Sequence, residues 1–265
     1  MFTEAYMQRA LLAAIFMAPL CALLGVFVTA RRMAFFSDTI SHAALAGIAL
    51  GFWLGMAEPV LPMVVVGLAV AAAMLWLKEN TDLHTDTIMA LLLAGSVSIG
   101  MILLSLLKTS RGDIHRFLFG DILAVSTPDL WLGGALLLAV GAGAMARLSD
   151  LALLTAQEEL AHVSGVPVRR LNGIFIVVLT LTVALSIRLL GIILVTSLLV
   201  IPPAAARNVS RNLRQQIILS LLAGLAAGLG GIVLSYRLDV PCGPAIVLTS
   251  IGIFLATLVA GRLRS

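Results

Sequence analysis

Residues 215–235 read QQIILSLLAGLAAGLGGIVLS, and no charged side chain occurs in this stretch. Its apolar residues follow one another without the polar–apolar alternation that is typical of a membrane β-barrel strand. A helix of about 20 apolar residues crosses the hydrocarbon core of a bilayer and satisfies its own backbone hydrogen bonds. The stretch therefore predicts a transmembrane helix.

Runs of the same kind recur along the whole chain. The expected spans cover residues 8–30, 40–57, 59–77, 87–107, 129–147, 172–190, 191–206, 215–235 and 242–261. Residues 108–128 are too polar for a plain span, and we expect an interfacial or re-entrant element there. The run 191–206 ends in two prolines, which predicts a broken or kinked helix. The prediction is an all-α integral membrane protein with eight or nine transmembrane helices, in a single domain over residues 1–265.

The composition excludes a water-soluble protein. Of the 265 residues, 61% are hydrophobic and 11% are charged, whereas a soluble domain carries about 25% charged residues. The net charge of +4 comes from arginines at the ends of spans, which indicates membrane orientation rather than nucleic-acid binding. Cys21 and Cys242 lie inside apolar runs without metal-ligand spacing, so we expect them to be small buried residues.

The basic residues also predict the orientation of the chain. With the carboxyl terminus in the cytoplasm, 11 of the 17 Lys and Arg residues fall on the cytoplasmic side, as the positive-inside rule favours. The longest hydrophilic segment, residues 148–171, then lies in the cytoplasm. Gln157 to Val163 can form a short helix there, which Gly165 and Pro167 end.

One polar pair stands beside a membrane-length apolar run. Asp38 and His42 occur in the stretch SDTISHA, residues 37–43, and their i, i+4 spacing puts both side chains on one face of a helix. A carboxylate and an imidazole are ligands that a borderline divalent cation prefers. Ionisable groups inside a membrane are functional candidates. The pair predicts a transient metal-binding face, because two ligands bind more weakly than the four of a closed zinc site.

Simpler roles remain open for these residues. Ser37 or Asp38 could cap the amino terminus of the helix, where the helix dipole favours a negative charge. His42 could make a structural hydrogen bond to a neighbouring helix. The spacing alone does not decide between these roles and metal binding.

The chain carries no catalytic motif. It lacks a Gly-x-x-x-x-Gly-Lys-Ser/Thr loop and a His-Glu-x-x-His zinc-peptidase motif. A second polar group, Asp82, His84 and Asp86, lies in a connection between two spans, where capping and solvation explain it. We therefore expect a protein that is not an enzyme, and whose energy comes from a partner or from an ion gradient.

Small residues and prolines indicate where helices pack and bend. Gly47 and Gly51 are spaced by four, which lets another helix approach closely. Pro202 and Pro203 are expected bending points.

Five segments together carry a family resemblance. They are Arg31–Ala43, Phe117–Val125, Glu158–Pro167, Thr196–Ala204 and Pro241–Pro244. In this order, and in a chain of this length, they resemble the zinc, manganese and iron permeases of bacterial ABC importers. The resemblance covers essentially the whole chain and is closest to the zinc-uptake branch.

The resemblance implies a fold similar to the vitamin B12-type importer permeases and a homodimer in the lipid of the bacterial inner membrane. Two copies of a separate ATPase would bind its cytoplasmic face, and a periplasmic metal-binding protein would deliver the cargo. No permanently bound cofactor is expected, because Zn²⁺ would be the transported substrate. Mn²⁺ or Fe²⁺ is the alternative cargo, since aspartate and histidine accommodate all three. A proton-coupled secondary metal transporter, with Asp38 and His42 as the relay, is the second alternative.

The resemblance also implies roles for further residues. Segment 150–170 would hold the coupling helix that seats in a groove of the ATPase. The implied coupling residues are Glu158, Glu159, Ala161 and Gly165, and the implied residues of the outer mouth are Asp113, His115 and Asp121.

Overall fold

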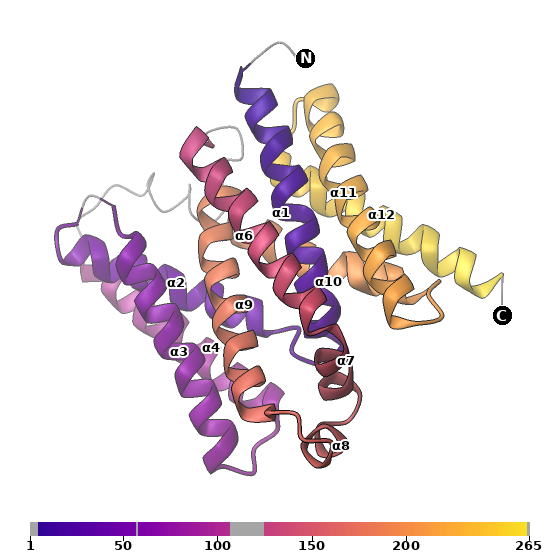
Figure 1. Cartoon of the computed structure of the whole chain (residues 1–265). Helices are drawn as coiled ribbons and strands as arrows, with labels where there is room; N and C mark the ends of the chain where they lie inside the picture. The colour runs from indigo at the N-terminus through magenta and orange to yellow at the C-terminus, as the bar shows by residue number, and fades with distance from the viewer. Residues whose placement is uncertain (1–4, 57, 107–124, 264–265) are drawn as a thin grey trace.

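A computed structural model describes residues 5–56, 58–106 and 125–263, and every ordered element in these ranges is a helix (Figure 1). The helices are α1 (Ala5–Ala30), α2 (Phe36–Trp53), α3 (Val60–Asn80), α4 (Thr85–Leu106), α6 (Thr127–Ala146), α7 (Leu148–Ala156), α8 (Glu158–Val163), α9 (Val168–Leu190), α10 (Ile192–Arg207), α11 (Leu213–Leu238) and α12 (Cys242–Arg262). The predicted all-α membrane architecture is confirmed.

Among the described helices, seven are long and apolar enough to cross a bilayer, namely α1, α3, α4, α6, α9, α11 and α12. The expected eight or nine spans are therefore slightly too many. α10 has 16 residues, about 24 Å at 1.5 Å per residue, which is short of a hydrocarbon core of about 30 Å. α2 has 18 residues, but its first turns hold polar side chains, including Ser37, Asp38 and Thr39.

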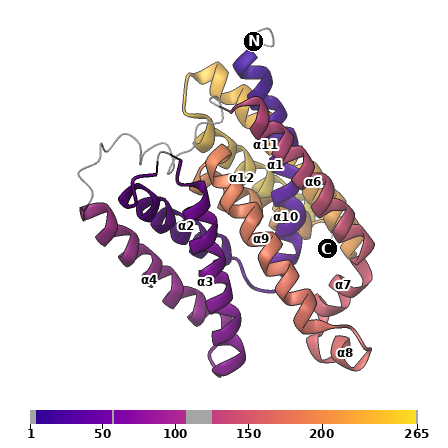
Figure 2. The same cartoon turned by 60° about the vertical axis from the view of Figure 1, so that its left-hand side comes forward.

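Helix α9 lies between two groups of helices (Figures 1 and 2). On one side, α2 packs against α3 and α4. On the other, α1 packs against α6, α10 and α11, and α12 packs against α10 and α11. Because α9 contacts α2 and α3 as well as α1, α6 and α10, it connects the two groups.

Helix α1 forms the centre of the second group. Of its apolar stretch, 78% is buried, compared with 56% for α9 and 17% for α12. Cys21 of α1 is buried and Cys242 of α12 is partly buried, and both are free thiols. The outer helices thus expose apolar side chains over much of their surface, which is the surface that lipid tails require.

The contact between α2 and α3 depends on small residues. An ideal Cβ atom on Gly47 would lie 2.6 Å from the carbonyl oxygen of Pro62, and one on Gly51 would lie 2.5 Å from the Cβ of Pro59. Both distances are shorter than carbon and oxygen atoms tolerate, so only glycine fits where the two helices meet.

The helical run is interrupted before α10 rather than at its prolines. Gly191 separates α9 from α10 and has a φ of 78°, a conformation that glycine adopts without steric cost. α10 then continues through Pro202 and Pro203 to Arg207 as one helix. The boundary expected between residues 190 and 191 is thus confirmed, and α10 is not broken at Pro202 and Pro203, whose role as bending points stays a prediction.

Two short helices lie together at one end of the bundle (Figure 1). The expected helix at 157–163 is present as α8, and α7 before it was not predicted. A small apolar cluster of Leu154, Ala161 and Leu171 joins α7, α8 and the start of α9.

Candidate functional site

Asp38 and His42 line a groove between α2 and α10. Both side chains are half-buried, and the groove has a volume of about 640 Å³. The other side chains that line it are Ala34, Phe35, Ile192, Ile193, Thr196, Ser197, Val200 and Ile201. The two ionisable residues thus share an open, largely apolar groove with two hydroxyl groups.

A hydroxyl group from α10 binds the carboxylate of α2. Oγ1 of Thr196 donates a hydrogen bond of 3.0 Å to Oδ1 of Asp38. Neighbouring Ser197 instead donates to the carbonyl oxygen of Leu194 at 2.9 Å within its own helix. The same hydroxyl lies 3.3 Å from the carbonyl oxygen of Ile192 in its own helix, so the bond to Asp38, a residue 158 positions away in the chain, is the shorter of its two contacts.

Thr196 is not among the site residues that the sequence predicts. The signal in the sequence is small, because Thr196 and Ser197 are simply two polar residues in a short apolar run. Only the packing of α10 beside α2 brings the threonine to Asp38.

The expected capping role of Ser37 or Asp38 is wrong. The helix begins at Phe36, and its N-cap residue is Phe35, whose side chain makes no capping bond. The helix starts early because the N–H of Phe36 already donates to the carbonyl of Met33 at 2.9 Å. Asp38 lies in the first turn, where the helix dipole still favours a negative charge.

The groove of one copy does not contain a complete metal site. Within the described ranges, no three residues of His, Cys, Asp or Glu gather closely enough to hold a metal ion. Asp38 and His42 supply two donors, whereas a closed zinc site uses four. The remaining ligands would have to come from water or from a second copy of the chain.

The other acidic and histidine groups lie elsewhere. Asp82, His84 and Asp86 are exposed around the connection between α3 and α4. Asp113, His115 and Asp121, which were predicted at the outer mouth, lie outside the described residues.

Helix α8 presents an exposed surface at the end of the bundle. Ala161 is fully buried against its neighbours, while Glu159 and Leu160 are exposed and Val163 is 84% exposed. Gly165 follows the helix with a φ of 80° and ends it. Glu158 is the first residue of the helix. One face of α8 is thus anchored and the other is free to contact a partner.

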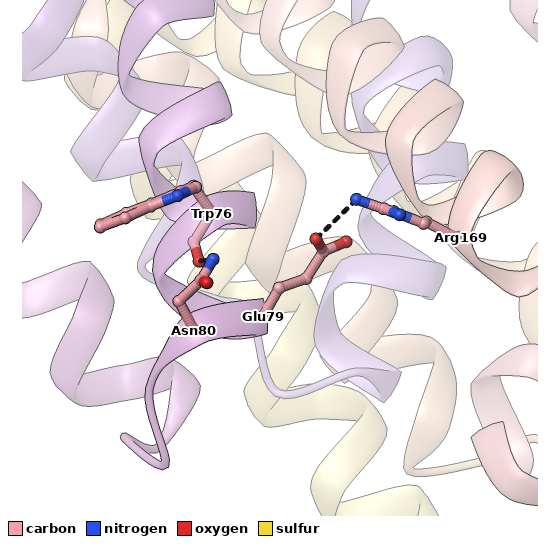
Figure 3. Close-up of polar contacts among 4 residues, drawn as sticks. All are labelled: Trp76, Glu79, Asn80 and Arg169. Atoms are coloured by element: carbon pink, nitrogen blue, oxygen red, sulfur yellow. Dashed lines mark hydrogen bonds and ion pairs between the residues drawn. The ribbon is translucent and has the colours of Figure 1, made fainter.

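A second cavity, of about 560 Å³, lies between α8 and the neighbouring helix ends. Its lining includes Arg31, Lys78 and His162. At its edge Arg169 of α9 forms an ion pair of 2.8 Å with Glu79 of α3 (Figure 3). Both partners are well exposed to solvent, so this pair contributes little to stability.

Comparison with known proteins gives a consistent result. The family described as "ABC 3 transport family" matches residues 3–261. The high-affinity zinc uptake system membrane protein ZnuB of Haemophilus influenzae is 36% identical over 249 residues, which cover 94% of this chain and 95% of that protein.

Two further relatives are named for other metals. The chelated iron transport system membrane protein YfeD of Yersinia pestis is 32% identical, over 99% of this chain and 88% of that protein. The manganese transport system membrane protein MntC of Halalkalibacterium halodurans is 29% identical, over 96% and 87%. Among solved structures, PsaBC from Streptococcus pneumoniae in complex with Fab matches with a TM-score of 0.85 and 29% identity, over 99% of this chain and 96% of that chain.

Proposed function

The chain belongs to the ABC 3 transport family, and we propose that it is the permease subunit of an ATP-driven importer whose cargo is Zn²⁺. As a member of this family it is a multi-pass protein of the bacterial inner membrane and a transport component, with ATP hydrolysis in a separate subunit. Its relatives are named for zinc, iron and manganese, so the family alone specifies a transition-metal cargo. The zinc assignment is supported by the similarity to ZnuB.

The observation that carries the proposal is the groove between α2 and α10. It combines a carboxylate, an imidazole and an orienting hydroxyl in an otherwise apolar wall. Such donors attract a divalent transition metal. Two ionisable donors bind it weakly enough for release, which transport requires.

A homodimer would complete the pathway. Two copies that meet along the groove would bring together two Asp38 and two His42 side chains, giving four protein ligands. We propose that this shared site holds the ion in one state of the transporter and loosens in the other, because a change in affinity between states is what drives release.

The two ends of the bundle would meet different partners. We propose that the exposed face of α8, with Glu159, Leu160 and Val163, contacts the ATPase on the cytoplasmic side. The periplasmic metal-binding protein would dock at the end of the bundle opposite α8.

Substitution of the groove residues tests the proposal. We expect His42→Ala and Asp38→Ala each to lower zinc accumulation by cells that depend on this permease by about tenfold or more, because loss of one ligand removes half of each copy's donors. His84→Ala is the matched control, since His84 is exposed in the connection before α4 and should leave uptake unchanged.

Normal accumulation in both groove variants, at normal abundance in the membrane, would contradict the proposed metal face. Uptake that follows a proton gradient and ignores ATP would instead favour the secondary transporter, in which Asp38 and His42 relay protons. Repeating the assay with Mn²⁺ and Fe²⁺ identifies the cargo.

A further inference from the structure

The connection between α1 and α2 is short and stiff. It spans residues 31–35, and the N–H of Met33 donates to the carbonyl of Val28 at 2.9 Å. Arg32 adopts a left-handed φ of 56°. These are the features of a Schellman motif, which fixes the direction in which the chain leaves a helix. A displacement of this connection therefore moves the first turn of α2, where Asp38 lies.

The side chain of Arg31 reaches from this connection to two other helices. Its Nη1 donates a hydrogen bond of 3.0 Å to Oδ1 of Asn172, and its Nε donates one of 3.3 Å to Oγ1 of Thr155. The guanidinium carbon lies 4.4 Å from the centre of the Phe175 ring, within the range of a cation–π interaction.

The three residues that Arg31 contacts belong to the helices that precede and follow α8 in the sequence. Thr155 belongs to α7, which leads into α8, and Asn172 and Phe175 belong to α9, which follows it. α8 in turn packs on α7 and α9 through Ala161. Arg31 is thus in direct contact with the two elements that hold α8, and is covalently attached to the start of α2.

We propose that Arg31 is the positioning residue that transmits a movement of α8 to the Asp38–His42 face of α2. The inference rests on the proposed function and deepens it by naming the link between energy input and the ion. A planar guanidinium binds two acceptors and a ring face at once, so it follows α7 and α9 as a unit. When these helices shift, the start of α2 shifts with them, and the geometry around the ion changes.

A purely structural role is the competing explanation. In that case Arg31 would stabilise the fold, and its loss would lower the amount of assembled transporter. The number of zinc ions transported per ATP hydrolysed distinguishes the structural role from the transmitting role. A structural defect lowers uptake and ATP hydrolysis in proportion, whereas loss of the connection between α8 and α2 lowers uptake alone.

The test uses the permease reconstituted in vesicles with its ATPase and its metal-binding protein. Zn²⁺ uptake and ATP hydrolysis are measured in the same preparation for Arg31→Ala and Arg31→Lys. We expect the zinc transported per ATP to fall about tenfold in the alanine variant, which loses two hydrogen bonds from a charged donor. Lysine keeps the charge without the planar fork and should restore only part of the ratio.

Two further variants sharpen the result. Asn172→Ala removes one acceptor of Arg31 without touching the connection, and should lower the ratio in the same direction by a smaller factor. It carries the test if Arg31→Ala does not assemble. Arg147→Ala is the control, because the ion pair of exposed Arg147 within the described part of the chain is local, with Asp150 three residues further on at 3.1 Å. It should keep the wild-type ratio.

A wild-type ratio in both Arg31→Ala and Asn172→Ala would overturn the inference, and so would a loss of uptake that merely follows the amount of assembled complex. If the wild-type vesicles take up zinc equally well without ATP, the proposed function fails and this inference fails with it.

Discussion

In the proposed metal-binding face, the hydrogen bond from Thr196 orients the carboxylate of Asp38. A carboxylate on an open helix face can rotate, and each orientation presents different oxygens. The Thr196 hydroxyl donates to Oδ1 of Asp38 at 3.0 Å, which favours one of these orientations. Partners of this kind orient metal ligands and tune their basicity. We therefore assign Thr196 a role in ion affinity although it need not touch the ion.

The substitution Thr196→Val tests this role. Valine keeps the shape of threonine and removes the donor, so the carboxylate of Asp38 loses its fixed orientation. Loss of a hydrogen bond that orients a metal ligand costs about 10–100-fold in metal affinity. We expect the zinc concentration that gives half-maximal uptake to rise by about tenfold, with little change in the amount of protein in the membrane.

Two control substitutions isolate the hydroxyl group. Thr196→Ser retains it and should keep most of the wild-type affinity. Ser197→Ala removes an adjacent hydroxyl that binds Leu194 instead, and should be neutral. An unchanged affinity in Thr196→Val would show that the bond to Asp38 is incidental.

The sequence could point to Asp38 and His42 but not to Thr196. The first two are four residues apart, so helix periodicity alone places them on one face. Thr196 meets Asp38 through the packing of two helices, and no local pattern records that contact. The start of α2 was predicted at residue 40, four residues too late, for a related reason. The hydrogen bond from the N–H of Phe36 to the carbonyl oxygen of Met33, which lies outside the helix, lets the helix begin at Phe36.

At the scale of elements, the backbone of α10 packs closely against Gly25 of α1. The carbonyl of Leu199 cannot receive the usual helical hydrogen bond, because the residue four positions later is Pro203, which has no N–H. That carbonyl faces Gly25 of α1, where an ideal Cβ atom would lie only 1.9 Å from its oxygen. The proline-containing half of α10 therefore requires glycine at this point of α1.

The substitution Gly25→Ala should displace α10. The added methyl group meets backbone atoms, which cannot rotate away. Overpacking of this kind costs about 1–3 kcal/mol. We expect a lower unfolding temperature in detergent, and also weaker zinc uptake, because Thr196 moves on the same helix.

Gly252→Ala provides the control for this prediction. Gly252 lies in α12 with nothing within 4 Å of an ideal Cβ, and alanine there should be neutral or stabilise the helix by up to about 1 kcal/mol. Equal stability of the two variants would mean that α10 can shift at no cost.

Most helices could be predicted from the sequence, and their ends less well. Long apolar runs gave α1, α3, α4, α6, α9, α11 and α12 to within a few residues, because the bilayer sets both length and composition. α7 was missed since nine residues carry too little periodicity. The boundary between α9 and α10 was predicted, because the expected spans 172–190 and 191–206 meet there, but the left-handed φ of Gly191 could not be read from the sequence.

At the scale of the whole molecule, α9 connects the group that carries Asp38 and His42 with the group built around α1. It begins directly after α8, and its first turns hold Arg169, Asn172 and Phe175. If α8 is displaced by a partner, as proposed, the displacement would reach both groups of helices through α9. This arrangement suits a transporter whose motor is a separate protein.

Family membership and membrane location could be read from the sequence, but the cargo could not. Five short segments in order were specific enough to identify the family. One carboxylate and one imidazole per copy suit zinc, manganese and iron(II) alike. Within the described ranges, one copy of the chain gathers no complete metal site whose geometry could distinguish these metals.

The most direct test of the account measures zinc accumulation by vesicles that contain the permease with its ATPase and its metal-binding protein. We predict that zinc accumulates inside when ATP is hydrolysed, and that without nucleotide the rate falls to that of vesicles without the permease. Filling at the same rate with and without nucleotide would contradict the account.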